Sequence, residues 1–147
     1  MNVTLNRTAE ILLVEDNLGA VRLTQEALKE SRIKNNLSIV DNGDEALKYL
    51  RKQHPYHEAI LPDLIMLDLN LPKRNGLQVL KEVKDDDLLK HIPVVILTTS
   101  KAEQDISACY RSHANCYITK PVDLRKFIQV IKIINHFWFS IVKLPSE

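Results

Sequence analysis

The sequence predicts an α/β fold of the (βα)5 type, a doubly wound five-stranded parallel sheet with helices on both faces. Two observations predict it: short apolar runs alternate with longer segments of helical periodicity, and every run ends at polar residues. The runs comprise residues 11–14, 37–40, 64–67, 94–97 and 116–118. Runs this short, rich in branched side chains and bounded by polar residues, are typical of parallel strands buried on both faces.

The segments between the runs carry apolar residues at the spacing of amphipathic helices. These segments comprise residues 18–31, 44–52, 76–84, 101–112 and a long final helix after Pro121. Asp44 is the candidate N-cap of the second segment. Strict alternation of strand and helix favours right-handed crossover connections.

No repeat, low-complexity tract or linker divides the 147 residues. This length suits one domain with a single core. We expect one domain over residues 1–147, with a core of about 10–135 and a C-terminal extension of about 136–147.

The composition excludes several classes of function. Lys and Arg number 20 against 19 Asp and Glu, so the net charge of +1 gives no drive toward nucleic acid or an anionic membrane. Neither a dinucleotide-binding glycine motif nor a P-loop is present. No apolar stretch approaches the ~18 residues of a membrane span, and no signal peptide is indicated. Cys109 and Cys116 form no CxxC pair, which favours a reducing, cytoplasmic setting.

Strong polar residues stand at the carboxyl ends of four predicted strands. Glu15 and Asp16 follow the first, Asp68 the third, Thr98 the fourth and Lys120 the fifth. Ligands of open α/β sheets bind at this edge. If these strands are neighbours, three carboxylates, a hydroxyl and an ammonium group converge on one pocket.

Three carboxylates at close quarters repel one another unless a cation neutralises them. An all-oxygen site suits Mg²⁺, so we infer a metal site built from Glu15, Asp16 and Asp68. Asn70, two residues beyond Asp68, is placed to add its backbone carbonyl. A structural Ca²⁺ site is the competing interpretation, but the loop motif typical of such sites is absent.

A carboxylate beside a metal ion and a cationic side chain can attack phosphorus and form an acyl phosphate. Asp68 would attack, Lys120 would neutralise developing charge on the phosphoryl oxygens, and Thr98 would donate a hydrogen bond to one of them. A small pocket without room for a nucleotide implies that the phosphoryl group arrives on another molecule.

Four motifs carry a resemblance to a known family. They are I-L-L-V-E-D-N (11–17), D-L-I-M-L-D-L-N-L-P (63–72), P-V-V-I-L-T-T-S (93–100) and C-Y-I-T-K-P (116–121). In order and spacing, the chain resembles the receiver domain of two-component response regulators over about residues 11–135. The resemblance implies a flavodoxin-like fold and a phosphoacceptor signalling protein that catalyses only its own phosphotransfer and slow autodephosphorylation.

The resemblance also implies roles for single residues. Asp68 is the implied phosphoacceptor, Asp16 the direct Mg²⁺ ligand and Glu15 a ligand acting through water. The remaining implied roles are the backbone ligand, the switch hydroxyl, the switch aromatic and the site lysine, at Asn70, Thr98, Tyr117 and Lys120. A cis Lys120–Pro121 bond is implied as well.

A narrower resemblance is to the small response regulators partnered with cyanobacterial phytochrome-type histidine kinases. Three segments carry it: E-D-N-L-G-A-V-R-L-T-Q-E-A-L (15–28), H-A-N-C-Y-I-T-K-P-V-D-L (113–124) and F-W-F-S-I-V-K-L-P (137–145). The implied partner is a sensor histidine kinase of phytochrome type, and the implied process is light signalling. Output is expected through protein contacts.

The final helical segment is apolar over more of its surface than one sheet-facing side requires. An exposed apolar patch usually marks an interface, and Trp and Phe are favoured anchors there. We therefore predict a two-fold homodimer, coupled to phosphorylation. The predicted interface comprises Phe127, Ile131, Ile134, Phe137, Trp138 and Phe139. The alternative is that these residues pack on the chain's own fourth helix.

Two other functions compete with the phosphoacceptor reading. A phosphatase with an aspartyl nucleophile needs a second acid two residues further on, and Asn70 has no carboxyl proton to give. A degenerate receiver that only docks other proteins is disfavoured by the complete acidic set and Lys120.

Overall fold

The computed structural model describes residues 7–145, which form one five-stranded parallel sheet in the order β2-β1-β3-β4-β5. The strands are β1 (Ala9–Val14), β2 (Asn35–Val40), β3 (Leu64–Leu67), β4 (Val94–Thr98) and β5 (Cys116–Thr119). The helices are α1 (Leu18–Lys29), α2 (Gly43–Leu50), α3 (Gly76–Asp85), α4 (Glu103–Arg111) and α5 (Leu124–His136). The predicted doubly wound (βα)5 fold is confirmed.

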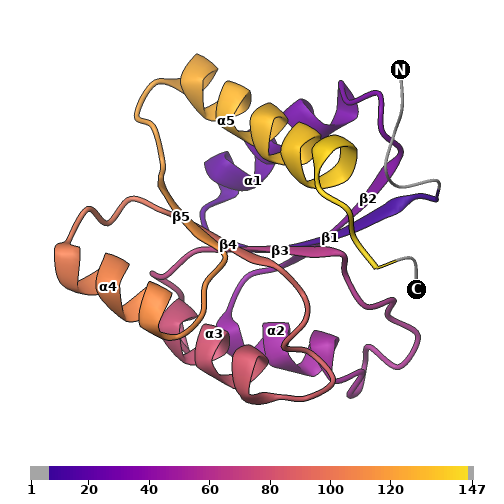
Figure 1. Cartoon of the computed structure of the whole chain (residues 1–147), viewed down its shortest axis with the longest axis vertical. Coiled ribbons are helices and arrows are strands. Elements are labelled where there is room, and N and C mark those ends of the chain that lie inside the picture. Colours follow the sequence, from indigo (N-terminus) through magenta and orange to yellow (C-terminus); the bar gives the residue numbers. More distant parts are fainter. Residues whose placement is uncertain (1–6, 146–147) are drawn as a thin grey trace.

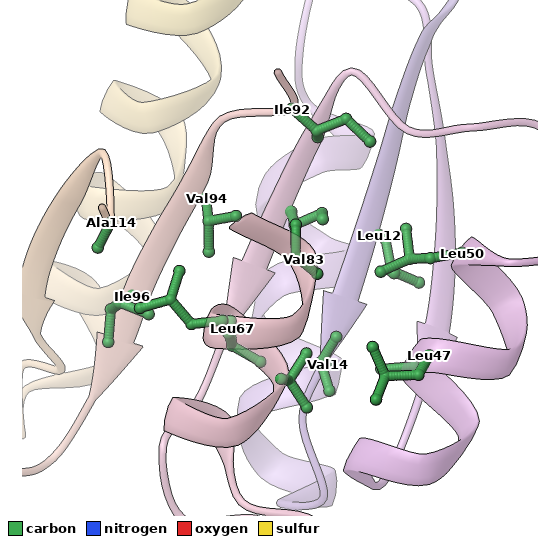
Figure 2. Packing of buried hydrophobic residues seen from close by; sticks show 14 of the residues in the cluster. Leu12, Val14, Leu47, Leu50, Leu67, Val83, Ile92, Val94, Ile96 and Ala114 are labelled. Carbon is green, nitrogen blue, oxygen red and sulfur yellow. The ribbon is translucent and has the colours of Figure 1, made fainter. Parts of the chain in front are cut away.

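Helices cover both faces of the sheet, with α1 and α5 on one face and α2, α3 and α4 on the other (Figure 1). Each face has its own apolar layer. Figure 2 shows the layer beneath α2 and α3, where Leu12 and Val14 of β1 lie among helix residues such as Leu47, Leu50 and Val83. The layer beneath α1 and α5 contains Ile11, Leu13 and Met66, which point the other way from the same strands. The three central strands are therefore fixed from both sides, and their carboxyl ends are held rigidly.

The edge strands differ from the prediction of strands buried on both faces. The apolar residues of β1, β3 and β4 are buried, whereas every residue of β5 and most residues of β2 keep partial exposure. An edge strand has a neighbour on one side alone, so the helices cover it less completely. Burial on both faces is thus a property of the inner strands.

The N-cap of α2 also differs from the prediction. Asn42, not Asp44, caps this helix, because its side-chain oxygen accepts a hydrogen bond of 2.9 Å from the Glu45 N–H. Asp44 lies inside the first turn, where a carboxylate complements the positive end of the helix dipole.

Most of the apolar residues that the sequence analysis placed in a dimer interface are buried within the chain by α5 and the segment after it. Four residues of the predicted dimer interface, Phe127, Ile131, Ile134 and Phe139, are buried within the chain, so their assignment to an interface is wrong. They pack toward the sheet and α1, which lies beside α5, and not on α4 as the alternative expected (Figure 1). A π-helix over Phe137–Ile141 follows α5 directly.

Phe137 remains exposed and Trp138 half-buried, with their rings 5.5 Å apart edge to face. Within residues 7–145, no helix has the length and apolar character needed to cross a membrane.

Candidate functional site

The site lies at the carboxyl edge of the three inner strands and β5. Val14 of β1 pairs with Leu67 of β3, so the residues that follow them leave the sheet side by side. Asp68 and Glu15 are buried, Asp16 is exposed, and each offers a carboxylate oxygen within 4.8 Å of the other two. The structure therefore brings the three predicted carboxylates together.

Lys120, at the end of β5, reaches the same point. Its Nζ donates to Glu15 Oε1 at 2.5 Å and to Asp68 Oδ2 at 2.9 Å. The ammonium group and both carboxylates are almost fully shielded from water, so each interaction acts in a medium of low polarity. Lys120 is placed to neutralise whichever carboxylate carries charge.

The implied cis Lys120–Pro121 bond is wrong for this structure. Among residues 7–145, His54–Pro55 is the cis peptide bond. With a trans bond before Pro121, the Lys120 N–H still donates to the Thr98 carbonyl at 2.7 Å, and its side chain still reaches both carboxylates. The ion pairs thus form without the cis bond.

The two buried carboxyl groups differ in pKa. Burial, reinforced by the charge of Asp68, raises the pKa of Glu15 to about 7, although the Lys120 hydrogen bond acts in the opposite direction. Burial also opposes ionisation of Asp68, but the hydrogen bonds from Lys120 and the Asn70 N–H outweigh it and lower the Asp68 pKa. Asp68 is therefore an ionised carboxylate at neutral pH, as a nucleophile requires.

Two further predicted residues surround Asp68. The Asn70 N–H donates to Asp68 Oδ1 at 3.1 Å, which orients the carboxylate. The Thr98 hydroxyl is buried and has no partner of normal hydrogen-bond geometry in the described residues, yet it lies close enough to Asp68 to favour the ionised form. An unsatisfied buried hydroxyl is unusual, and this one lies beside the Asp68 carboxylate.

Tyr117, the predicted switch aromatic, is tethered at two points. Its hydroxyl donates to the Ser100 carbonyl at 3.0 Å, and its N–H donates to the Tyr110 hydroxyl at 3.1 Å. The Ser100 hydroxyl in turn donates to Asp105 Oδ2 at 2.6 Å, near the start of α4. Sequence reasoning missed Ser100, Asp105 and Tyr110, because each is an ordinary polar residue of a loop or helix whose partner is distant in sequence or is backbone.

The donor set fits a hard divalent cation. Glu15, Asp16 and Asp68 offer oxygen ligands only, and three carboxylates stand against the single ammonium of Lys120. The exposed Asp16 gives an ion access from water. The position of the Asn70 carbonyl as a further ligand stays a prediction.

Gly76 lets α3 start directly against the Asp68 loop. Its N–H donates to the Leu69 carbonyl at 3.0 Å, and a Cβ at this position would overlap the Asp68 carbonyl oxygen and lie 2.7 Å from Leu69 Cα. In the sequence, the start of α3 can be recognised from Asn75, because Asn75 and Gln78 have the spacing of a capping box and form one in the structure.

We expect Gly76→Ala to destabilise the chain by about 3 kcal/mol, because the new methyl group meets backbone that cannot rotate away. Urea unfolding measures the loss. Gly19→Ala is the matched control, since its Cβ would meet only the Asn17 side chain at 3.2 Å. Equal midpoints for the two variants would contradict the close approach at Gly76.

The comparison with known families decides what kind of protein carries this site. A model of the response regulator receiver domain matches residues 11–132. The chain belongs to the receiver family. The resemblance that the four short motifs indicated is therefore confirmed over most of the chain.

Individual relatives of this receiver are response regulators, and one of them is a cyanobacterial phytochrome response regulator. Response regulator Rcp1 of Synechocystis sp. is 46% identical over 136 residues, which is 92% of each chain. The crystal structure of the phosphorylated cyanobacterial phytochrome response regulator RcpA has a TM-score of 0.93 and 49% identity, covering 95% of this receiver and 100% of that chain. The Mn²⁺-bound form of Rcp1 has a TM-score of 0.90 and 46% identity, covering 93% and 99%. A related receiver thus binds a divalent metal, and the narrower resemblance to cyanobacterial phytochrome regulators is confirmed.

Proposed function

We propose that this receiver accepts a phosphoryl group on Asp68 from a sensor histidine kinase of a two-component system. The observation that carries the proposal is the ionised, buried Asp68 carboxylate held by Lys120 Nζ at 2.9 Å beside two further acidic groups. A structural ion pair would not need the additional carboxylates of Glu15 and Asp16, since they add repulsion.

The proposed step is an in-line displacement at phosphorus. An oxygen of Asp68 forms a bond to phosphorus while the bond from phosphorus to the kinase's histidine nitrogen breaks, and the electron pair stays on the imidazole. Lys120 turns toward the transferred group because the Asp68 charge it neutralised moves onto the phosphoryl oxygens. The chain's contribution is positioning and charge stabilisation.

Mg²⁺ is the proposed cofactor, and when bound it supplies positive charge to the phosphoryl oxygens. Asp16 and Asp68 would hold it directly, Glu15 through water, and Asn70 through its backbone carbonyl. The all-oxygen donor set supports Mg²⁺, because this ion prefers oxygen ligands and keeps part of its water shell.

The proposed output is a change in the surface around β4 and β5. The unpaired Thr98 hydroxyl would donate to a phosphoryl oxygen and draw the end of β4 inward. The carbonyl of Ser100, two residues after Thr98, accepts a hydrogen bond from the Tyr117 hydroxyl. Movement of this loop would therefore release or reorient the Tyr117 ring.

The proposed partner is a phytochrome-type histidine kinase, which makes the process light signalling. The support is the identity of 49% with RcpA and 46% with Rcp1. Kinases of this kind use ATP, so the proposal places this receiver in the cytoplasm. We also propose that residues 1–147 act as one receiver domain.

Phosphotransfer from a purified phytochrome-type kinase, loaded with radiolabelled ATP, tests the proposal. We expect acid-labile label to move to this receiver in the presence of Mg²⁺, and more slowly from an unrelated histidine kinase. Label from acetyl phosphate but from neither kinase would refute only the partnership. Failure with every donor would refute the phosphoacceptor role and leave a docking module.

We further propose a homodimer, on a smaller patch than the sequence indicated. Ile133, Phe137 and Ile141 follow one another at intervals of four residues, and they are 66%, 45% and 58% exposed. The half-buried Trp138 packs edge to face on Phe137. A stripe of exposed branched and aromatic side chains suits a self-complementary contact with a second copy of α5 and the π-helix.

We expect Ile133→Glu to weaken self-association about thirtyfold, on the order of 2 kcal/mol, because it puts a charge into the apolar contact. Sedimentation velocity measures the change. Leu88→Glu, at another exposed apolar residue after α3, is the matched control and should leave association intact. The patch is refuted if both variants associate like the wild type. Repeating the series with a phosphoryl mimic tests the predicted coupling to phosphorylation.

A further inference from the structure

β2 forms one edge of the sheet, and its outer side pairs with no other strand of the described chain (Figure 1). The Ala9 N–H donates to the Lys34 carbonyl at 2.9 Å, and the Glu15 N–H donates to the Val40 carbonyl at 3.0 Å. Because the backbone groups of successive residues face opposite sides of a strand, the even-numbered residues of β2 face β1. Within residues 7–145, no hydrogen bond reaches the N–H and C=O groups on the outer side. These outward groups belong to Asn35, Leu37 and Ile39.

The two edges of the sheet are protected differently. At the β5 edge, the Tyr117 N–H donates to the Tyr110 hydroxyl at 3.1 Å, so α4 covers an outward backbone group there. β2 lacks the usual features that keep an edge strand from pairing with another chain. Its six residues, N-N-L-S-I-V, include neither a charged residue nor a proline, and its register with β1 has no bulge. β2 is therefore an open template for a further strand.

The charges that flank β2 favour a second copy of the same strand. Lys34 comes directly before β2 and Asp41 directly after it, and both are exposed. If two copies of β2 pair antiparallel about Leu37, Lys34 of each copy comes within one residue of Asp41 of the other. Two-fold symmetry forms this favourable contact twice. Parallel pairing would instead set lysine against lysine and aspartate against aspartate.

The apolar side chains of β2 are also self-complementary. Leu37 packs at the margin of the core beneath α1, and Ile39, on the same face of the strand, is 37% exposed. In the antiparallel arrangement, Leu37 lies opposite its own copy, with Ile39 diagonal to it. Apolar pairs across neighbouring strands stabilise a sheet, so the contact would cover surface that β2 leaves exposed.

From these features we propose that two copies of the chain join antiparallel through β2, so that their two sheets continue into one. The backbone groups of Leu37 bond to those of Leu37 in the second copy, and the groups of Asn35 bond to those of Ile39. Asp68 follows β3, which is separated from β2 by β1, so the contact lies away from the proposed phosphorylation site. The contact is also separate from the exposed stripe of α5.

Amide hydrogen exchange followed by NMR tests the proposal in the Ile133→Glu variant of the full chain, which keeps the α5 stripe out of the measurement. We expect weak association, with a Kd of about 100 µM, because a contact between two edge strands buries less than the ~1,200 Å² of stable complexes. Between about 20 µM and about 1 mM protein, exchange at Leu37 and Ile39 should slow about fivefold. The inward amides of Asn36 and Ser38, already bonded to β1, should change less. Exchange at Leu37 and Ile39 that does not depend on concentration would overturn the proposal.

Charge variants test the antiparallel register, in the same background and by sedimentation velocity. Lys34→Glu and Asp41→Lys should each weaken association about tenfold, because each turns two attractions into repulsions. The double variant should restore association, since the two charges are exchanged and the antiparallel contact again joins opposite signs. Lys81→Glu, the same charge change at an exposed lysine of α3, is the matched control and should associate like its parent. A double variant that associates no better than Lys34→Glu would refute the antiparallel pairing of β2.

Discussion

Asp68→Asn is expected to abolish phosphorylation, lowering incorporation from acetyl phosphate by at least about a thousandfold. The amide that replaces the carboxylate has nearly the same shape but is not a nucleophile. Asparagine keeps one side-chain oxygen, which can still accept from the Asn70 N–H, whereas the amide nitrogen in place of Oδ2 cannot accept from Lys120, which keeps its bond to Glu15. Acid-labile, Mg²⁺-dependent label on the intact chain is the measurement.

Asp87→Asn is the control for this experiment, since Asp87 is an exposed carboxylate after α3 that pairs with Lys90 on the surface. It should incorporate label like the wild type. Circular dichroism of both variants should superimpose on the wild type, which separates loss of chemistry from loss of fold. Normal labelling of Asp68→Asn would mean that another side chain is the acceptor.

Lys120→Met is expected to give three changes at once. The variant loses about 3 kcal/mol of stability without Mg²⁺, because two buried carboxylates lose the cation between them. Its affinity for Mg²⁺ rises about tenfold, because the ammonium no longer competes for the same oxygens. Phosphorylation falls about a hundredfold even at saturating Mg²⁺, because no side chain neutralises the transferred group.

Urea unfolding, calorimetric titration with Mg²⁺ and label incorporation measure the three changes. Lys48→Met is the matched control, because Lys48 faces Glu45 at 3.5 Å in an exposed pair of α2. Exposed ion pairs contribute about 0.5 kcal/mol to stability, so Lys48→Met should differ little from the wild type in stability, Mg²⁺ affinity and phosphorylation. Unaltered Mg²⁺ affinity in Lys120→Met would show that the ammonium and the ion do not share the carboxylates.

Much of the fold was predictable because the inner strands and helices follow simple periodicities. The runs at 64–67 and 94–97 coincide with strands that are buried on both faces, where only apolar residues fit. The carboxylates could be placed together for a related reason: parallel strands end at one edge, so a polar residue after each strand is brought near the others. The pairing of Val14 with Leu67 fulfils this expectation.

What could not be predicted depends on contacts between segments distant in sequence. Phe127 and Ile131 looked surplus to one helix face, but α1 packs beside α5 and buries them. The tether between Tyr117 and Ser100 joins a strand to a loop seventeen residues earlier, and it leaves no periodic trace.

The ion pairs of Lys120 span nearly the whole chain, since 105 residues separate it from Glu15 and 52 from Asp68. A nascent chain on the ribosome, or one cleaved before β5, therefore has the acceptor without its counter-charge. We therefore expect efficient phosphorylation only of chains that have folded through β5.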